Sequence, residues 1–282
     1  MMPRARYLAA LFFVWTSIFA SACASEPGAA PGAVDGGPEG DAGAAVDAGD
    51  AGAAVGDAAA DANDRPDARD DILGTLSGTC GVIAAELAKP TPAFVENTLS
   101  FAAGEQYAKP YLTPGGQTLF DAANAGGSST ESEVMSFEVL HHCDGATLLK
   151  TETQIKYEAP DAGSNAITDI LVEIAGQKVG VSVTRAYKPA NLGYTDADAV
   201  TLLTKKLEGV NRSSERVLPA DKWVKQVLHV FAATDAQEAA VRRVWPTLDA
   251  ALRADTVVVL TRTTGGGFVY CDPDPALGSE CP

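Results

Sequence analysis

Hydrophobic positions follow two patterns in the second half of this chain. Some runs alternate apolar and polar residues, which is typical of half-buried strands, and others place apolar residues every three to four positions, which favours helices. The expected elements, in chain order, are a helix at 130–142, strands at 146–157, 167–174 and 178–185, a helix from 195 to Gly209, a strand at 226–232, a helix from Thr234 to 252 with a kink at Pro246, and a strand at 256–261. This order predicts an α/β fold, a mixed sheet flanked by helices in three layers.

The preceding segment, residues 76–120, has a less regular pattern. Prolines interrupt it repeatedly, and Gly115 and Gly116 are expected to form a turn between short strands. We therefore treat residues 71–129 as an N-terminal strand and turn subdomain or extension, residues 130–264 as the α/β core, and residues 265–282 as a tail that contains two cysteines.

The N-terminus has the pattern of an export signal. Two arginines, Arg4 and Arg6, precede an apolar run at 7–20 that is short for a membrane span. We expect residues 1–22 to be a signal peptide. The residues Ile18-Phe19-Ala20-Ser21-Ala22-Cys23 resemble the lipobox of bacterial lipoproteins, although the family usually has leucine where Ala20 stands. The resemblance implies that Cys23 is lipidated, with palmitate among its acyl chains, and anchors the protein in a membrane. Cleavage after Ala20-Ser21-Ala22 to release a soluble periplasmic or secreted protein is the alternative.

Residues 23–70 contain the lipid-anchor cysteine and a segment of extreme composition. Between positions 24 and 70 the chain is mostly Ala, Gly, Asp and Pro, has no aromatic residue, and carries 11 acidic and 2 basic residues. Such a segment buries too little apolar surface to offset the entropy of ordering. We expect a disordered, extended tether, repelled from an anionic membrane surface by its own charge.

The remaining residues, 71–282, suffice for one domain with a sizeable core. They carry 26 acidic and 17 basic residues, in a chain of formal net charge −16. Because nucleic-acid binding draws mainly on Lys and Arg that neutralise phosphates, this balance argues against a nucleic-acid partner, apart from a local basic groove. The expected partners are the membrane, through the Cys23 lipid, and a ligand or protein of the cell envelope.

Four further cysteines, Cys80, Cys143, Cys271 and Cys281, lie in the folded part. An even number in an exported chain favours two disulfides, with three possible connectivities. Cys271 and Cys281 could close a short loop, which would leave Cys80 with Cys143. The run His141-His142-Cys143-Asp144 resembles a ligand cluster, but adjacent helical side chains point about 100° apart, so we interpret it as a helix end. His229 lies in an apolar run and is expected to be a satisfied core residue.

The order of elements over 130–263 resembles the restriction-endonuclease-like core of the PD-(D/E)xK nuclease superfamily. The resemblance rests on Thr168-Asp169-Ile170, at the position of the family's first acidic residue, and on Val181-Ser182-Val183-Thr184-Arg185, at the position of its acidic-x-Lys pattern. In that family these residues hold a divalent metal and activate water. The resemblance implies that Asp169, Ser182 and Thr184 mark the catalytic position, together with Glu133 or Glu138 from the preceding helix.

The hairpin between the two central strands can be paired from the sequence. If Gly176 and Gln177 form its loop, Asp169 pairs with Thr184, and alternation places Asp169, Leu171, Glu173, Ser182 and Thr184 on one face. The opposite face is entirely aliphatic and is expected to be core.

The acidic-x-Lys pattern is replaced here by Ser182-Val183-Thr184, which removes one carboxylate and the lysine. A cation such as Mg²⁺ or Mn²⁺ would depend on Asp169 with Glu138, or with Glu133. Glu173 and Glu152 are further candidates, and Lys150, Lys205 or Arg185 could replace the lysine, although alternation turns Arg185 to the other face. No cofactor is certain from the sequence. We therefore expect a nuclease-like fold without catalysis that acts as a binding or structural module, with a metal-dependent nuclease of migrated active site as the alternative.

Overall fold

The computed structural model describes residues 73–123, 130–159 and 166–270 of the chain. Cys23, Cys271, Cys281 and the expected signal peptide and tether lie outside these residues, so the expectations placed on them stay predictions. Among the described residues, no helix combines the length and the hydropathy that a membrane span requires.

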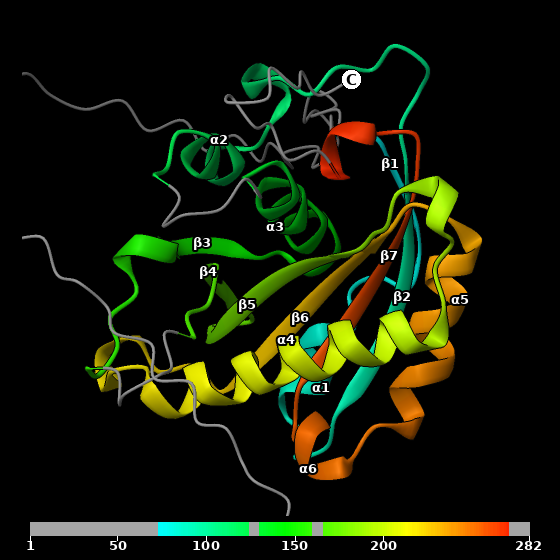
Figure 1. The fold of residues 1–282 in the computed structure, drawn as a ribbon. Helices are drawn as coiled ribbons and strands as arrows, with labels where there is room; N and C mark the ends of the chain where they lie inside the picture. The colour runs from blue at the N-terminus through cyan, green and yellow to red at the C-terminus, as the bar shows by residue number, and fades with distance from the viewer. Residues whose placement is uncertain (1–72, 124–129, 160–165, 271–282) are drawn as a thin grey trace, which may run out of the picture. The chain divides into compact units, whose positions relative to one another are not determined.

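The centre of the fold is a mixed seven-stranded sheet (Figure 1). Its strands are β1 (Thr75–Gly78), β2 (Ala93–Ser100), β3 (Thr147–Thr151), β4 (Ile170–Ile174), β5 (Gln177–Ala186), β6 (Lys225–Ala232) and β7 (Val257–Thr264). They lie in the order β1-β2-β7-β6-β5-β4-β3. The four central strands, β2, β7, β6 and β5, are parallel, and β1, β4 and β3 pair antiparallel at the two sides.

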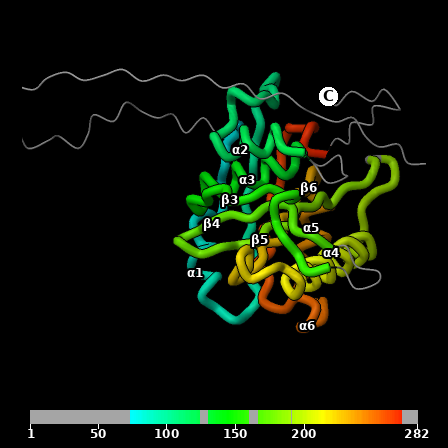
Figure 2. Tube along the Cα trace, turned by 90° about the vertical axis from the view of Figure 1, so that its left-hand side faces the viewer, coloured from blue at the N-terminus to red at the C-terminus, as the bar shows by residue number. Residues whose placement is uncertain are grey.

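Helices cover both faces of the sheet (Figures 1 and 2). They are α1 (Ile83–Leu87), α2 (Pro114–Phe120), α3 (Thr130–Asp144), α4 (Asp196–Arg216), α5 (Asp235–Val244) and α6 (Ala250–Arg253). Buried side chains of α3 pack on one face of the sheet, in a cluster that includes Phe137, Val181 and Phe231. Those of α4 and α5 pack on the other face with Leu228 and Leu260. The predicted three-layer α/β fold is thus confirmed, and the central strands are buried on both faces, as parallel strands require.

Residues 71–129 contribute to the same sheet. β2 pairs with β7 along its whole length, from Ala93 with Val257 to Ser100 with Thr264, and β1 adds the outermost strand on that side. This region therefore extends the sheet of the core by two strands.

The expected turn at Gly115 and Gly116 is wrong, because both residues lie inside α2. Thr113 caps this short helix by accepting a hydrogen bond from Gly116 N–H, and Pro114 occupies its first turn. A Cβ atom at Gly115 would collide with the Phe137 ring, and one at Gly116 with the Glu138 carboxylate. The glycines are used for close packing of α2 on α3.

Two helix expectations need correction. α4 continues through Gly209 to Arg216, since its buried side continues with Val210 and Ser213. The helix that begins after Thr234 does not run kinked through Pro246 but ends at Val244, and a short 3₁₀ turn precedes α6. Thr195 and Thr234 cap their helices with reciprocal side-chain hydrogen bonds, the arrangement known as a capping box.

The hairpin between β4 and β5 has a register different from the expected one. Its loop residues are Ala175 and Gly176, with φ of 51° and 75°, so Ile174 pairs with Gln177 and Ile170 with Val181. Two successive residues with positive φ are typical of a type I′ turn. The register moves by two residues, which preserves the predicted faces but shifts Asp169 away from Thr184 and toward Ser182.

The end of α3 carries the His141-His142-Cys143-Asp144 run, and its interpretation as a helix end is confirmed. His141 Nδ1 lies 2.8 Å from the carbonyl oxygen of Ala146, and Asp144 accepts a hydrogen bond of 2.9 Å from Ile83 N–H. Cys143 forms a disulfide with Cys80, which confirms this one of the expected pairings. The disulfide and the Asp144 contact attach the end of α3 to the start of α1.

Candidate functional site

The candidate site lies at the start of β4, where β5 continues beyond its pairing with that strand. Within the described residues, β4 pairs with Gln177–Val181, whereas β5 stays paired with β6 as far as Ala186. We call the remaining part of β5, residues 182–186, the free edge of β5. Asp169, which immediately precedes β4, is held at the start of this edge.

Asp169 and Lys206 bind the two peptide groups of the same residue on this edge. Asp169 Oδ2 accepts a hydrogen bond of 2.6 Å from Val183 N–H, and Lys206 Nζ donates to Val183 O at 3.3 Å. The N–H and C=O of one strand residue point toward the same neighbouring strand. The Asp169 carboxylate and the Lys206 ammonium therefore occupy adjacent positions where a strand partner would otherwise lie.

Groups from four elements shift the pKa of Asp169: α3, the 3₁₀ turn after β3, β5 and α4. Burial, together with the negative charges of Glu133 on α3 and of Glu152 after β3, raises its pKa to about 7, although Lys206 and the Val183 N–H act in the opposite direction. Glu133 is itself buried, with 8% of its surface exposed. The Glu133 charge disfavours ionisation of Asp169 because like charges repel strongly in a buried site.

Ser182 and Thr184 lie on the face of β5 that meets α4, and both are buried, with 7% and 8% exposed. Ser182 Oγ donates weakly to Gln226 Oε1 at 3.4 Å. The amide nitrogen of Gln226 binds Val210 O and the hydroxyls of Ser213 and Ser214 on α4. Ser182 thus belongs to a polar network that joins β5, β6 and α4.

Glu138 has a partner elsewhere. Its Oε1 accepts hydrogen bonds from the N–H and the hydroxyl of Thr113, at 3.1 and 2.7 Å, and its Oε2 lies 3.5 Å from Nε2 of His142. Five residues of helix separate it from Glu133, which turns the two side chains about 140° apart. The structure brings Glu133, and not Glu138, to Asp169.

The lysine nearest Asp169 is one that the sequence analysis missed. Lys150 instead pairs with the buried Asp221 at 2.6 Å, Lys205 is exposed, and Arg185 acts on Tyr270 on the α3 side, as alternation predicted. The angular positions of the two neighbouring lysines around α4 would have identified it. Lys206 lies about 60° from the buried Leu203 and Lys205 about 160° from it, so Lys206 is the lysine that faces the sheet.

The described part of the chain contains no cluster of potential metal ligands, at the Asp169 site or elsewhere. Within residues 73–123, 130–159 and 166–270, no group of three or more His, Cys, Asp or Glu side chains has the arrangement of a metal site. Glu173 is exposed on β4, beside Lys178 in the sheet.

His229 is a satisfied core residue, as predicted. Its Nδ1 lies 2.8 Å from Ser136 Oγ, and its Nε2 lies 2.6 Å from Thr261 Oγ1, which donates to Asn97 Oδ1 at 2.6 Å. Burial lowers the pKa of His229 to about 3, which keeps the ring neutral at pH 7. Because Ser136 has no exposed surface, this serine and histidine pair joins α3 to the sheet and does not meet a substrate.

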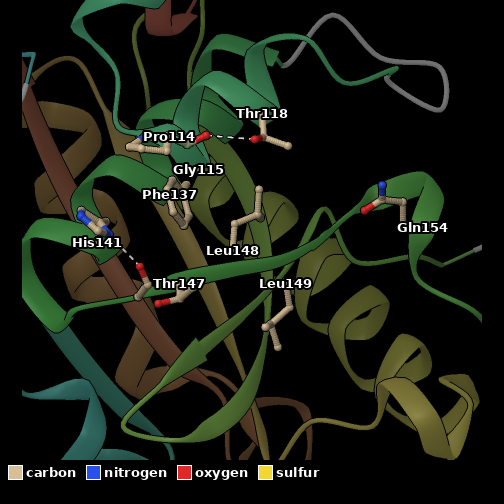
Figure 3. Close-up of a pocket in the computed structure, with 10 residues that line it drawn as sticks. Pro114, Gly115, Thr118, Phe137, His141, Thr147, Leu148, Leu149 and Gln154 are labelled. Atoms are coloured by element: carbon tan, nitrogen blue, oxygen red, sulfur yellow. Dashed lines mark hydrogen bonds between the residues drawn. The ribbon is translucent and has the colours of Figure 1, made fainter. Parts of the chain in front are cut away.

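A separate pocket of about 520 Å³ lies between α2, α3 and β3 (Figure 3). Pro114, Gly115 and Thr118 line it from α2, Phe137 from α3, and Leu148 from β3. Thr118 Oγ1 and the His141 ring make hydrogen bonds to backbone carbonyl groups at its border. None of its lining residues belongs to the Asp169 site.

Comparison with known proteins gives limited similarity. No protein-family model matches the chain. The AAC-rich mRNA clone AAC4 protein of Dictyostelium discoideum is 41% identical over 167 residues, which are 56% of this chain and 24% of that protein. The chain thus spans about a quarter of that relative. The solved structure of Pyrococcus furiosus SfsA in complex with Ca²⁺ superposes with a TM-score of 0.27 at 13% identity, over 49% of this chain and 56% of that chain. A superposition of this quality carries no argument about function.

Proposed function

We propose that this protein is an exported, lipid-anchored module of the bacterial cell envelope whose α/β domain binds a ligand and does not cleave it. The supporting observation is the engagement of Asp169. Its carboxylate accepts the Val183 N–H at 2.6 Å in place of a strand partner, so it stabilises the end of the sheet. The acidic-x-Lys positions hold Ser182 and Thr184, which are buried against α4.

The anchoring part of the proposal rests on the sequence pattern that ends at Cys23. It is tested by replacing Cys23 with Ala in the full chain and by measuring the distribution of the mature protein between membrane and soluble fractions. We expect the native protein in the membrane fraction with a diacylated N-terminal cysteine by mass spectrometry, and the Cys23→Ala protein outside it. Retention of the variant in the membrane contradicts lipid anchoring.

A second candidate function, a metal-dependent nuclease with a migrated active site, is favoured by one observation. Lys206 supplies a cation beside Asp169, and Glu133 supplies a second carboxylate. Mg²⁺ sites commonly use one or two protein carboxylates together with substrate phosphate oxygens, so Asp169 and Glu133 fit the minimum donor set. A bound metal would supply Lewis-acid stabilisation of a phosphodiester.

Metal binding separates the two candidates. Calorimetric titration of the protein with Mn²⁺ or Mg²⁺ at pH 8 is compared with the same titration of Asp169→Asn and of Glu173→Gln, a matched control that removes an exposed carboxylate from β4. The binding module predicts no millimolar affinity that depends on Asp169. Affinity lost in Asp169→Asn and kept in Glu173→Gln favours the nuclease.

A further inference from the structure

A small basic pocket lies beyond the free edge of β5, between the end of that strand and the first half of α4. Its volume is about 250 Å³. Its charged and aromatic lining comprises Arg185, Tyr187, Lys188, Tyr194, Asp198 and Lys205. The pocket is distinct from the Asp169 site, although Lys205 and Lys206 are neighbours on α4.

The charge of this pocket is opposite to that of the chain. Three cations and one carboxylate line it, which leaves a local charge of about +2 in a protein of formal net charge −16. Asp198 balances Lys188, with Nζ and Oδ1 2.7 Å apart, and Lys205 is exposed. A phosphomonoester carries about −1.5 to −2 charges at pH 7, so its charge matches that of the pocket.

Tyr194 provides a second, independent indication of a ligand. It lines the same pocket, and its hydroxyl is buried with no hydrogen-bond partner among the described residues. A buried hydroxyl without a partner costs free energy, so such groups in native proteins call for an explanation. A ligand oxygen would satisfy it after a shift of the Tyr194 side chain, because the hydroxyl itself has less than 1 Å² of accessible surface.

Tyr187 adds an aromatic surface beside the cations. Its side chain is 51% exposed, and its ring stacks on that of Tyr270, with centroids 5.8 Å apart and 28° between the planes. Tyr270 is fixed in turn by a hydrogen bond of 2.8 Å between its hydroxyl and that of Thr263. Tyr187 is thus a held aromatic ring with open surface, suited to contact a sugar or base ring.

We infer that this pocket binds a small ligand in which a phosphate group is attached to a ring, with Arg185 and Lys205 facing the phosphate, Tyr194 donating to one of its oxygens and Tyr187 contacting the ring. The inference rests on the proposed binding function and names its ligand class. A sugar phosphate and a nucleotide share this chemistry, and the volume of the pocket fits the phosphate and one ring.

Isothermal titration calorimetry of the full chain in detergent tests the inference. The probes are glucose 6-phosphate and AMP, with inorganic phosphate, glucose and adenosine as the controls that lack the ring or the phosphate. We expect at least one ring phosphate to bind more tightly than inorganic phosphate and the neutral probes not to bind. Preference for glucose 6-phosphate or for AMP identifies a saccharide or a nucleotide as the source. The inference is overturned if neither glucose 6-phosphate nor AMP binds at concentrations up to about 10 mM, because a weaker dissociation constant does not indicate a specific site.

Three substitutions locate the binding. Lys205→Gln is expected to weaken affinity at least about fivefold by removing a charge-assisted contact, whereas Arg212→Gln, which removes an exposed cation from the same helix, leaves it unchanged. Tyr194→Phe is expected to weaken binding while the melting temperature of the free protein stays equal or rises, since an unsatisfied hydroxyl is lost. Affinity unchanged by both Lys205→Gln and Tyr194→Phe overturns the inference. If the chain is membrane-anchored and does not cleave phosphodiesters but binds no ring phosphate, the ligand assignment fails and the binding-module proposal stands.

Discussion

Replacing Asp169 with Asn tests the electrostatics of the candidate site. The amide keeps an oxygen for the Val183 N–H and removes the charge that Glu133 and burial disfavour. We expect the Asp169→Asn protein to lose less stability than the native protein as pH rises from 4 to 8.

The sign and size follow from the pKa. In the folded protein the Asp169 pKa is raised from 3.8 to about 7, so the folded state holds the proton more tightly than the unfolded chain. The stabilisation from this proton is complete below the unfolded pKa and is lost as pH rises through about 7. Each pKa unit corresponds to about 1.4 kcal/mol, so the free energy of unfolding falls by at most about 4 kcal/mol across this range.

Urea unfolding of the native and Asp169→Asn proteins at pH 4, 5, 6, 7 and 8 measures this difference directly. Two further variants check its cause by carboxyl NMR titration of Asp169. Glu133→Gln removes a negative charge and is expected to lower the Asp169 pKa, and Lys206→Met removes a positive charge and is expected to raise it. Parallel pH profiles for the native and Asp169→Asn proteins would refute the electrostatic account of the site.

Three further predictions concern the packing that positions this site. Gly116→Ala is expected to destabilise the protein by about 1–3 kcal/mol in urea unfolding, because its Cβ would collide with a buried α3 carboxylate. Gly209→Ala is the control: a Cβ at this position of α4 meets open space, so the change is expected to stabilise the protein by up to about 1 kcal/mol. Equal effects of the two changes contradict the packing of α2 on α3. Reduction of the Cys80–Cys143 disulfide, which spans 63 residues, is expected to lower the free energy of unfolding by about 4 kcal/mol, and an unchanged urea midpoint in reductant speaks against it. Thr261→Val leaves two buried polar partners unpaired and is expected to cost about 1–3 kcal/mol, a loss that Thr261→Ser should largely avoid.

The sequence predicts most of the core because its strands are buried on one or both faces. Apart from Leu171, the aliphatic positions of the hairpin strands lie on the face opposite Asp169, Ser182 and Thr184, and a register shift of two residues preserves this separation. The exact register depended on Ala175, which adopts a positive φ that its side chain does not signal. A prediction of which residues share a face was therefore reliable, whereas a prediction of which residues are opposite each other was not.

Short helices and long-range contacts were harder to predict. α1 and α2 have five and seven residues, too few for a helical period to be recognised, and the glycines of α2 resemble those of a turn. In the candidate site, Asp169 could be identified from its place before a strand. To predict the role of Lys206, one must know how α4 is oriented relative to a strand more than twenty residues earlier. The spacing of charged residues in the sequence does not give this orientation.

The measurement that tests the central claim most directly is divalent-metal-dependent cleavage of single- and double-stranded DNA and RNA by the purified full chain, with Asp169→Ala as control. Our account assigns Asp169 to the end of the sheet and the domain to ligand binding. It predicts no cleavage above the level of the Asp169→Ala protein in Mg²⁺ or Mn²⁺ at pH 8, where the Asp169 carboxyl is ionised. Cleavage by the native protein that disappears in Asp169→Ala would contradict the account and establish a nuclease with Asp169 in its active site.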